Sequence, residues 1–263
     1  MSIRRISAIV IRHLYMWPRS MERLMGSFGW PILEIIIWGL TMSYFQNSLF
    51  HNFSLLSIIL GSLIMWQIIA RTQTETSIIF LDEIWNKNLI NIFSSPLTKG
   101  EFLISIIVLN LIKIFFTILS LSLIGFTFYK FNLIASFGFY LPFLLFNLFL
   151  TGWSVGFFVI GMILRFGYKI QELAWAIVLF IQPFSCVYYP VSSLPVWARY
   201  ISMLFPSSYL FEEMRNILSN QTVNPNNLYA SFTLNIIYLS LSIWFFSSMF
   251  EKGREYGRLV KLN

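Results

Sequence analysis

The chain has few charged residues and almost none of the residues that bind metals or form disulfides. Asp, Glu, Lys and Arg make up only 11% of its 263 residues, and it holds one cysteine, Cys186, and two histidines, His13 and His51. One cysteine excludes an intrachain disulfide, and two histidines offer a metal almost no ligands. We therefore expect neither a disulfide framework nor a metal centre.

Catalytic motifs are missing as well. The sequence contains no HExxH, no GxSxG, no aspartate-rich pair and no glycine-rich phosphate loop. We therefore predict that the chain is not an enzyme, with no catalytic residues, and that it binds no cofactor of its own. If ATP drives it, ATP and magnesium are expected on a separate partner subunit.

Apolar residues dominate instead: 57% of the residues are hydrophobic and 19% are aromatic. Soluble domains do not have this balance. Six apolar runs are near or above the roughly 20 residues needed to cross a bilayer, and they cover residues 28–47, 53–72, 102–128, 137–163, 170–190 and 228–250. We predict an all-α membrane protein with six transmembrane helices, forming a single transmembrane domain over residues 1–263.

The basic residues predict the orientation of these helices. The net charge of +7 is spread over the ends of the apolar runs, with no basic arm, so we expect membrane lipid and no nucleic acid as a partner. Fourteen of the 18 Lys and Arg fall on one side if that side is the cytoplasm. Both termini are then cytoplasmic, in the inner (plasma) membrane. Residues 1–27 should form an amphipathic segment on the membrane surface.

The connection between the second and third runs, residues 73–101, is too polar to cross lipid. Its apolar residues recur at three- and four-residue spacing, which predicts an amphipathic helix ending before Pro96. Thr98 and Glu101 have the spacing of a capping box that begins the next helix. Two interpretations are open: a helix resting on the lipid headgroups, or a docking site for a soluble partner.

Two charges lie inside predicted spans, Glu34 in the first and Lys113 in the third. Embedded charges are costly, and we predict that these two form a pair. The alternative is that Lys113 extends to the headgroups while Glu34 bonds a neighbouring helix. Pro31 and Pro183 are expected to bend or break the first and fifth spans.

Other polar and small residues suggest contacts between helices. Gly152 and Gly156 form a GxxxG motif, which permits close helix packing. Asn147, Thr151, Gln182 and Asn235 are polar residues in apolar surroundings, and most are expected to bond across helices. Residues 188–220 should form two short helices whose apolar faces dip back into the outer leaflet; the alternative is an ordinary outer loop with an interfacial helix.

Two stretches resemble the membrane subunit of ABC exporters of the second permease superfamily, which has the type V exporter fold, and residues 31–39 in the first span are a third, looser match. Residues 88–97, NLINIFSSPL, followed by EFL at 101–103, are similar to the segment after the second span in that family. Residues 189–195, YPVSSLP, continuing to PSSY at 206–209 and FEEMR at 211–215, are similar to its outer re-entrant helices.

This resemblance implies a half-transporter that pairs with a second permease copy, expected as a homodimer, and with ABC ATP-binding subunits. The helix after the second span would be the coupling helix that docks on the ATPase, and the docking residues are then Asp82, Glu83, Trp85, Lys87, Asn88, Leu89 and Phe93. The first and fifth spans would line the path, which makes Pro31, Gln182 and Pro183 gate or path candidates.

The function we expect is ATP-driven export of a small amphipathic molecule, such as a drug or a lipid-like compound. A polysaccharide or lipid-linked glycan exporter is the first alternative, because relatives of both kinds are similar. A channel or secondary carrier independent of ATP is the second. Such a carrier would need an inverted repeat, and we find none in the sequence.

Overall fold

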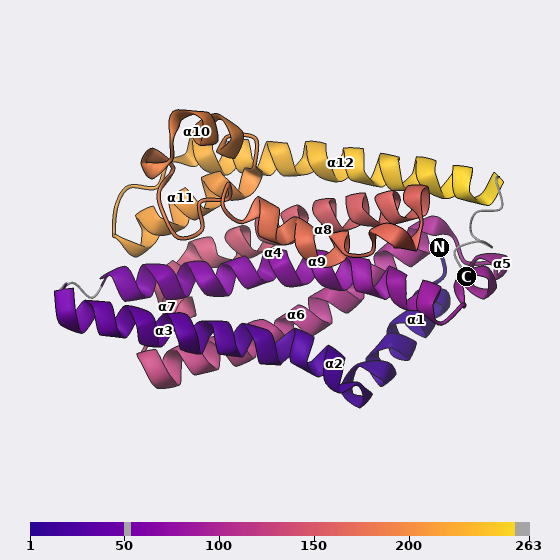
Figure 1. Cartoon of the computed structure of the whole chain (residues 1–263), viewed down its shortest axis with the longest axis horizontal. Helices are drawn as coiled ribbons and strands as arrows, with labels where there is room; N and C mark the ends of the chain where they lie inside the picture. Colours follow the sequence, from indigo (N-terminus) through magenta and orange to yellow (C-terminus); the bar gives the residue numbers. More distant parts are fainter. Residues whose placement is uncertain (50–53, 256–263) are drawn as a thin grey trace.

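The computed structural model is a bundle of long helices, with no strand among the residues it describes, 1–49 and 54–255. Five helical stretches are long and apolar enough to cross a membrane: Met21–Phe45, Leu55–Trp85, Lys99–Tyr129, Leu133–Phe166 and Pro225–Glu255. They contain α3 (Trp30–Leu49), α4 (Ser54–Trp85), α6 (Lys99–Tyr129), α8 (Leu141–Phe166) and α12 (Pro225–Glu255). The long helices run along the long axis of the molecule in Figure 1, and the all-α prediction is confirmed.

Residues 170–190, predicted as the fifth of six spans, do not form one long helix. They contain the 3-10 turn Tyr168–Ile170 at their start, then α9 (Leu173–Ile181), and then turns. Proline has no N–H to donate, and α9 ends two residues before Pro183. The predicted break at Pro183 is confirmed, and by length the described residues hold five spans and not six.

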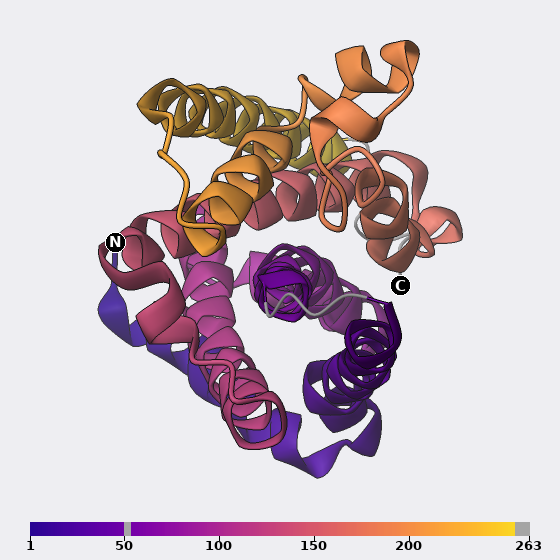
Figure 2. The same cartoon turned by 90° about the vertical axis from the view of Figure 1, so that its left-hand side faces the viewer.

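Helix α4 forms the centre of the bundle. Every residue from Ile59 to Ala70 is buried, and α4 packs against α3, α6, α8 and α9. Figure 2 looks along the bundle and shows α4 end-on with the other long helices around it. The largely apolar stretch from Ile59 to Ala70 is stable in such a position, because it packs against several other helices.

The GxxxG motif brings α8 close to this central helix. A Cβ added to Gly152 would lie 2.5 Å from Cβ of Thr72, and one added to Gly156 would lie 2.7 Å from Cβ of Thr76. No real side chain tolerates such distances, so the two glycines set how closely α8 approaches α4.

The opposite side of α8 is bonded to α12. Asn235 Nδ2 donates to Asn147 Oδ1 at 3.0 Å, and Thr151 Oγ1 donates to Asn235 Oδ1 at 2.9 Å. The predicted interhelical hydrogen bonds of these three residues are therefore confirmed.

The short helices gather at the two ends of the bundle (Figure 1). Helices α1 (Ile3–Met16) and α5 (Leu89–Ser94) lie at the same end as the last residues of α12. Helices α7 (Leu133–Phe137), α10 (Val196–Ser202) and α11 (Pro206–Leu218) lie towards the other end, so the two short helices predicted within 188–220 are present. The remaining helical pieces are α2 (Met21–Leu24), a π-helical segment (Met25–Gly29) and three further 3-10 turns (Trp17–Arg19, Gly138–Tyr140 and Val191–Ser193).

The connection around residues 78–93 differs from its prediction. Instead of one surface helix, α4 continues to Trp85, the chain turns over residues 86–88, and α5 adds only six residues. Lys87 adopts a φ of +52°, which no helix residue has, and the helix therefore ends there. The capping box between Thr98 and Glu101 is confirmed.

Candidate functional site

Asp82 and Glu83, expected on a water-facing side, are buried, with 6% and 1% of their surface exposed. Glu83 forms an ion pair with Arg12 and accepts a hydrogen bond from Nε2 of His13 at 2.9 Å. Asp82 pairs with Arg23 at 3.0 Å. The prediction of a wet face is wrong for these two residues, because the N-terminal segment covers both carboxylates and neutralises them.

His13 is held in its neutral form in this contact. Burial, with the nearby charges of Arg12, Lys113 and Arg23, lowers the pKa of His13 to about 3. The imidazole is therefore uncharged at neutral pH, and its Nε2–H acts as a neutral donor to Glu83.

We expect the contact of α1 with α4 to weaken as the pH falls below about 6.5, the ordinary pKa of His13. Below that pH His13 is protonated in the unfolded chain but stays neutral in the folded chain until about pH 3. The free energy of unfolding therefore decreases as the pH falls from about 6.5 towards 3. The loss at pH 5 is about 2 kcal/mol. The drop in melting temperature from pH 7.5 to 5 measures it, and His13→Gln should reduce that drop. An unchanged drop in the variant would contradict the assignment.

The predicted docking residues divide into exposed and buried ones. Trp85 is 46% exposed, Lys87 is exposed and Asn88 is half-buried. Leu89 is fully buried, so it supports the turn from inside. The side chain of Phe93 lies outside the described part of the structure. A partner at this end of the molecule would therefore meet the turn over residues 85–88.

The start of α6 is tied to both terminal helices of the chain, α1 and α12. Arg5 on α1 pairs with Glu101 at 3.2 Å, and the backbone N–H of Ser2 donates to the same carboxylate at 2.7 Å. Lys99, at the start of α6, forms an ion pair with Glu251 near the end of α12. These contacts join the start of α6 to α1 and to the end of α12.

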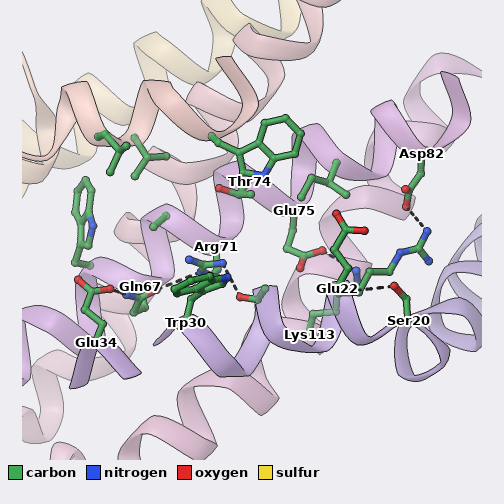
Figure 3. Close-up of a pocket in the computed structure, with 18 of the residues that line it drawn as sticks. Ser20, Glu22, Trp30, Glu34, Gln67, Arg71, Thr74, Glu75, Asp82 and Lys113 are labelled. Carbon is green, nitrogen blue, oxygen red and sulfur yellow. Dashed lines mark hydrogen bonds and ion pairs between the residues drawn. The ribbon is translucent and has the colours of Figure 1, made fainter. Parts of the chain in front are cut away.

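A cavity of about 570 Å³ lies beside α4, bounded by α2, α3, α6 and α9 (Figure 3). This volume is in the range of small-molecule sites. In Figure 3, Glu34 and Gln67 stand at one end of the cavity, and Ser20 and Asp82 at the other. Its lining combines seven charged side chains with four tryptophans: Glu22, Arg23, Glu34, Arg71, Glu75, Asp82 and Lys113, with Trp30, Trp66, Trp85 and Trp175.

Glu34 and Lys113 both line this cavity but do not pair with each other. Lys113 Nζ lies 2.6 Å from Glu75 Oε2, and Glu34 accepts hydrogen bonds from Gln67 Nε2 at 2.5 Å and from the hydroxyl of Tyr188 at 3.4 Å. The predicted pair is absent because α4 supplies a partner to each charge. The alternative prediction for Glu34, a hydrogen bond to a neighbouring helix, is confirmed by its bond to Gln67 on α4.

The predicted path residue Gln182 connects to Glu34 through Tyr188. Gln182 Nε2 donates to the Tyr188 hydroxyl at 2.8 Å, and that hydroxyl donates to Glu34. On the other side Arg71 Nε donates to Gln67 Oε1 at 3.2 Å. One hydrogen-bonded chain therefore joins the end of α9 to α3 and α4.

Pro31 is buried and leaves the first span unbroken, since the helical stretch Met21–Phe45 runs through it. Proline cannot donate to the carbonyl four residues earlier, that of Ser27. That carbonyl accepts a hydrogen bond from Thr117 Oγ1 at 3.1 Å instead. The distortion that Pro31 was expected to cause is limited to the π-helical segment just before it.

Sequence reasoning missed Glu75 and Tyr188. Glu75 carried a signal, because Gln67, Arg71 and Glu75 recur every four residues and so share one face of a helix. That face was overlooked because the second span was predicted to end at residue 72, whereas α4 continues to Trp85. Tyr188 is one of 12 tyrosines, and nothing in the sequence distinguishes it.

Five apolar helices of membrane-spanning length and a charged cavity beside the central one define an integral membrane protein. A family model described as ABC-2 type transporter matches residues 6–219, which is more than half of the chain. The chain belongs to this family, and the resemblance seen in residues 88–103 and 189–215 is confirmed. The comparison with curated proteins gave no match. Permeases of this family generally pair with an ATP-binding subunit.

Proposed function

We propose that the chain is the transmembrane half of an ATP-driven exporter for a small amphipathic molecule. The observation that carries this proposal is the cavity beside α4, which places charged groups and tryptophan rings side by side in a member of a transporter family. Polar groups would hold one end of an amphipathic molecule, and the indole rings would pack against the other. The chain itself supplies no catalytic group, and ATP hydrolysis takes place on a partner subunit.

The ATP-binding subunit docks on the turn over residues 85–88 and on α5, in the place of a coupling helix. The turn is exposed, and the ion pairs of Asp82 and Glu83 just before it hold it rigidly in place; we call residues 85–88 with α5 the handle. Helix α4 joins this handle directly to the cavity residues Gln67, Arg71 and Glu75. A movement of the handle therefore shifts one wall of the cavity, as a two-state transport cycle requires.

A second path leads from the handle to α9. The Trp85 ring stacks on that of Trp175, with centroids 6.4 Å apart, and Trp85 Nε1 donates to Gln171 Oε1 at 3.1 Å. Since Trp175 lies in α9 and also lines the cavity, docking at Trp85 would move two walls together.

The whole chain acts as one transmembrane domain that pairs with a second copy across α3 and α9. Its N-terminal segment, the 85–101 region and the end of α12 face the cytoplasm of the inner membrane, and α10 and α11 face outwards as re-entrant helices. The position of α1, α5 and the end of α12 at one end of the bundle supports this orientation (Figure 1). Residues 170–190 then cross as the sixth span, partly as helix and partly as turns.

Cysteine labelling tests the orientation. The native Cys186 is fully buried, so it gives little background. We expect Lys87→Cys to react with a membrane-impermeant maleimide in inside-out vesicles and not in intact cells, and Trp197→Cys, an exposed site on α10, to show the opposite pattern. Labelling of Lys87→Cys from outside the cell would rule out docking of a cytoplasmic ATPase at this turn.

A further inference from the structure

Glu34 is the half-buried carboxylate of the cavity for which the described residues provide no ion pair. Asp82 is paired with Arg23 and Glu75 with Lys113, but the hydrogen bonds to Glu34 come from the neutral side chains of Gln67 and Tyr188. A carboxylate accepts up to about four hydrogen bonds, so Glu34 has capacity for a further donor. Glu22, the remaining carboxylate of the cavity, is exposed to solvent, whereas Glu34 is half-buried, so a ligand gains more by neutralising Glu34.

The charge balance of the cavity favours a cation. Four carboxylates and three basic side chains line it, which leaves one negative charge in excess. Two of the three bases are consumed in ion pairs. The third, Arg71, donates to the Gly26 carbonyl at 2.6 Å and to Gln67 Oε1 at 3.2 Å.

Arg71 lies near Glu34, because both side chains bond to Gln67, and its positive charge weakens the attraction of Glu34 for any cation. A small, strongly hydrated ion would have to give up its water to bind here, and the weakened attraction of Glu34 would not compensate for that cost. A bulky organic cation loses little hydration, because its charge is spread out or shielded by carbon. The site therefore selects for organic cations over simple metal ions.

Aromatic rings near Glu34 add to this selection. Trp30 is one helical turn before Glu34 on α3, lines the cavity and is 63% exposed. Tyr188, bonded to Glu34, stacks on Trp38 with ring centroids 5.2 Å apart. The exposed ring of Trp30 attracts organic cations through its face, and its area accommodates an apolar substituent. The ring of Tyr188 is stacked on Trp38, so Tyr188 acts on Glu34 through its hydroxyl.

We propose that Glu34, together with Trp30, binds the positively charged group of the transported molecule, and that the substrate class is an organic cation with an apolar body. The inference rests on the proposed function, because it names the substrate class of the same cavity. Glu34 is then a specificity-determining residue, with Gln67 and Tyr188 positioning its carboxylate.

Two ions of matched size and opposite charge, tetraphenylphosphonium and tetraphenylborate, test the proposal. Binding of each to the full chain in lipid nanodiscs is measured by quenching of tryptophan fluorescence. We expect Glu34→Gln to weaken binding of the cation by about tenfold, which corresponds to one charge interaction in a partly buried site, and to leave binding of the anion unchanged or improved. The matched control is Glu22→Gln, which removes an exposed carboxylate of the same cavity and should change cation binding less than twofold.

Three results would overturn the proposal: no effect of Glu34→Gln, an equal loss for cation and anion, or an equal effect of Glu22→Gln. An unchanged melting temperature of Glu34→Gln shows that the variant is folded, and Glu34→Asp should restore part of the cation preference. Because the assay needs no ATPase, it separates the two claims. A chain that binds the cation but never associates with an ATPase would refute the exporter and keep the site, whereas an active exporter indifferent to charge at residue 34 would refute only the site.

Discussion

The amount of ATP-binding subunit that co-purifies with the chain is expected to fall at least tenfold when Trp85→Ala and Lys87→Glu are combined. Trp85 offers a large, half-exposed ring and Lys87 a fully accessible charge on the turn that we assign to docking. Aromatic and charged anchors at the centre of an interface carry most of its binding energy. Quantifying the co-expressed ATPase after affinity purification, together with ATP-dependent transport in vesicles, measures the effect.

Two controls isolate docking from folding. Trp197→Ala removes another exposed tryptophan, 63% exposed, on α10 towards the opposite end of the bundle, and should leave the ATPase bound. Gln171→Ala removes the hydrogen-bond partner of Trp85 in the turn just before α9 and should impair transport more than association. If the double variant kept its ATPase and transported normally, the turn would not be the docking site. Leu89→Asp is a poor test, because it would place a charge in the interior.

Lys113→Met is expected to destabilise the chain by about 3–5 kcal/mol, the usual result of removing one partner of a buried ion pair. It would leave the buried Glu75 without its ion-pair partner, and in the described part of the chain its other carboxylate oxygen accepts a hydrogen bond from Ser27 Oγ at 3.2 Å. The melting temperature in detergent and the yield of folded protein should both fall clearly.

The double variant Lys113→Met with Glu75→Met removes both charges and should recover most of that stability. Apolar residues of similar volume replace buried ion pairs at little cost, so the two changes should be far from additive. If the double variant were destabilised by the sum of the two single losses, Lys113 and Glu75 would not be coupled, and the ion pair would not explain the effect of Lys113→Met. Lys130→Met, a lysine that carries no ion pair in the described structure, is the matched control and should be nearly neutral.

The sequence alone determined the class of the molecule and most of its long helices. Four of the five long helices, all except α4, both begin and end within about five residues of the ends of an apolar run, because about 20 apolar residues are needed to cross lipid. The longer extent of α4 escaped prediction, since its last turns carry Asp82 and Glu83, which look like surface residues until their partners are known. The capping box at Thr98 and the helix end before Pro183 were predictable because each depends on residues close in the chain.

The tertiary structure decided which polar residues meet. Glu34 with Tyr188 and Lys113 with Glu75 are separated by 154 and 38 residues, and no local pattern specifies such partners. The same holds for Asp82 and Glu83, whose burial depends on how the N-terminal segment folds back onto α4. Hydrophobic periodicity says that a helix will be buried, but the partner of a buried charge is set by the packing of distant helices, and so the cavity became visible only in the fold.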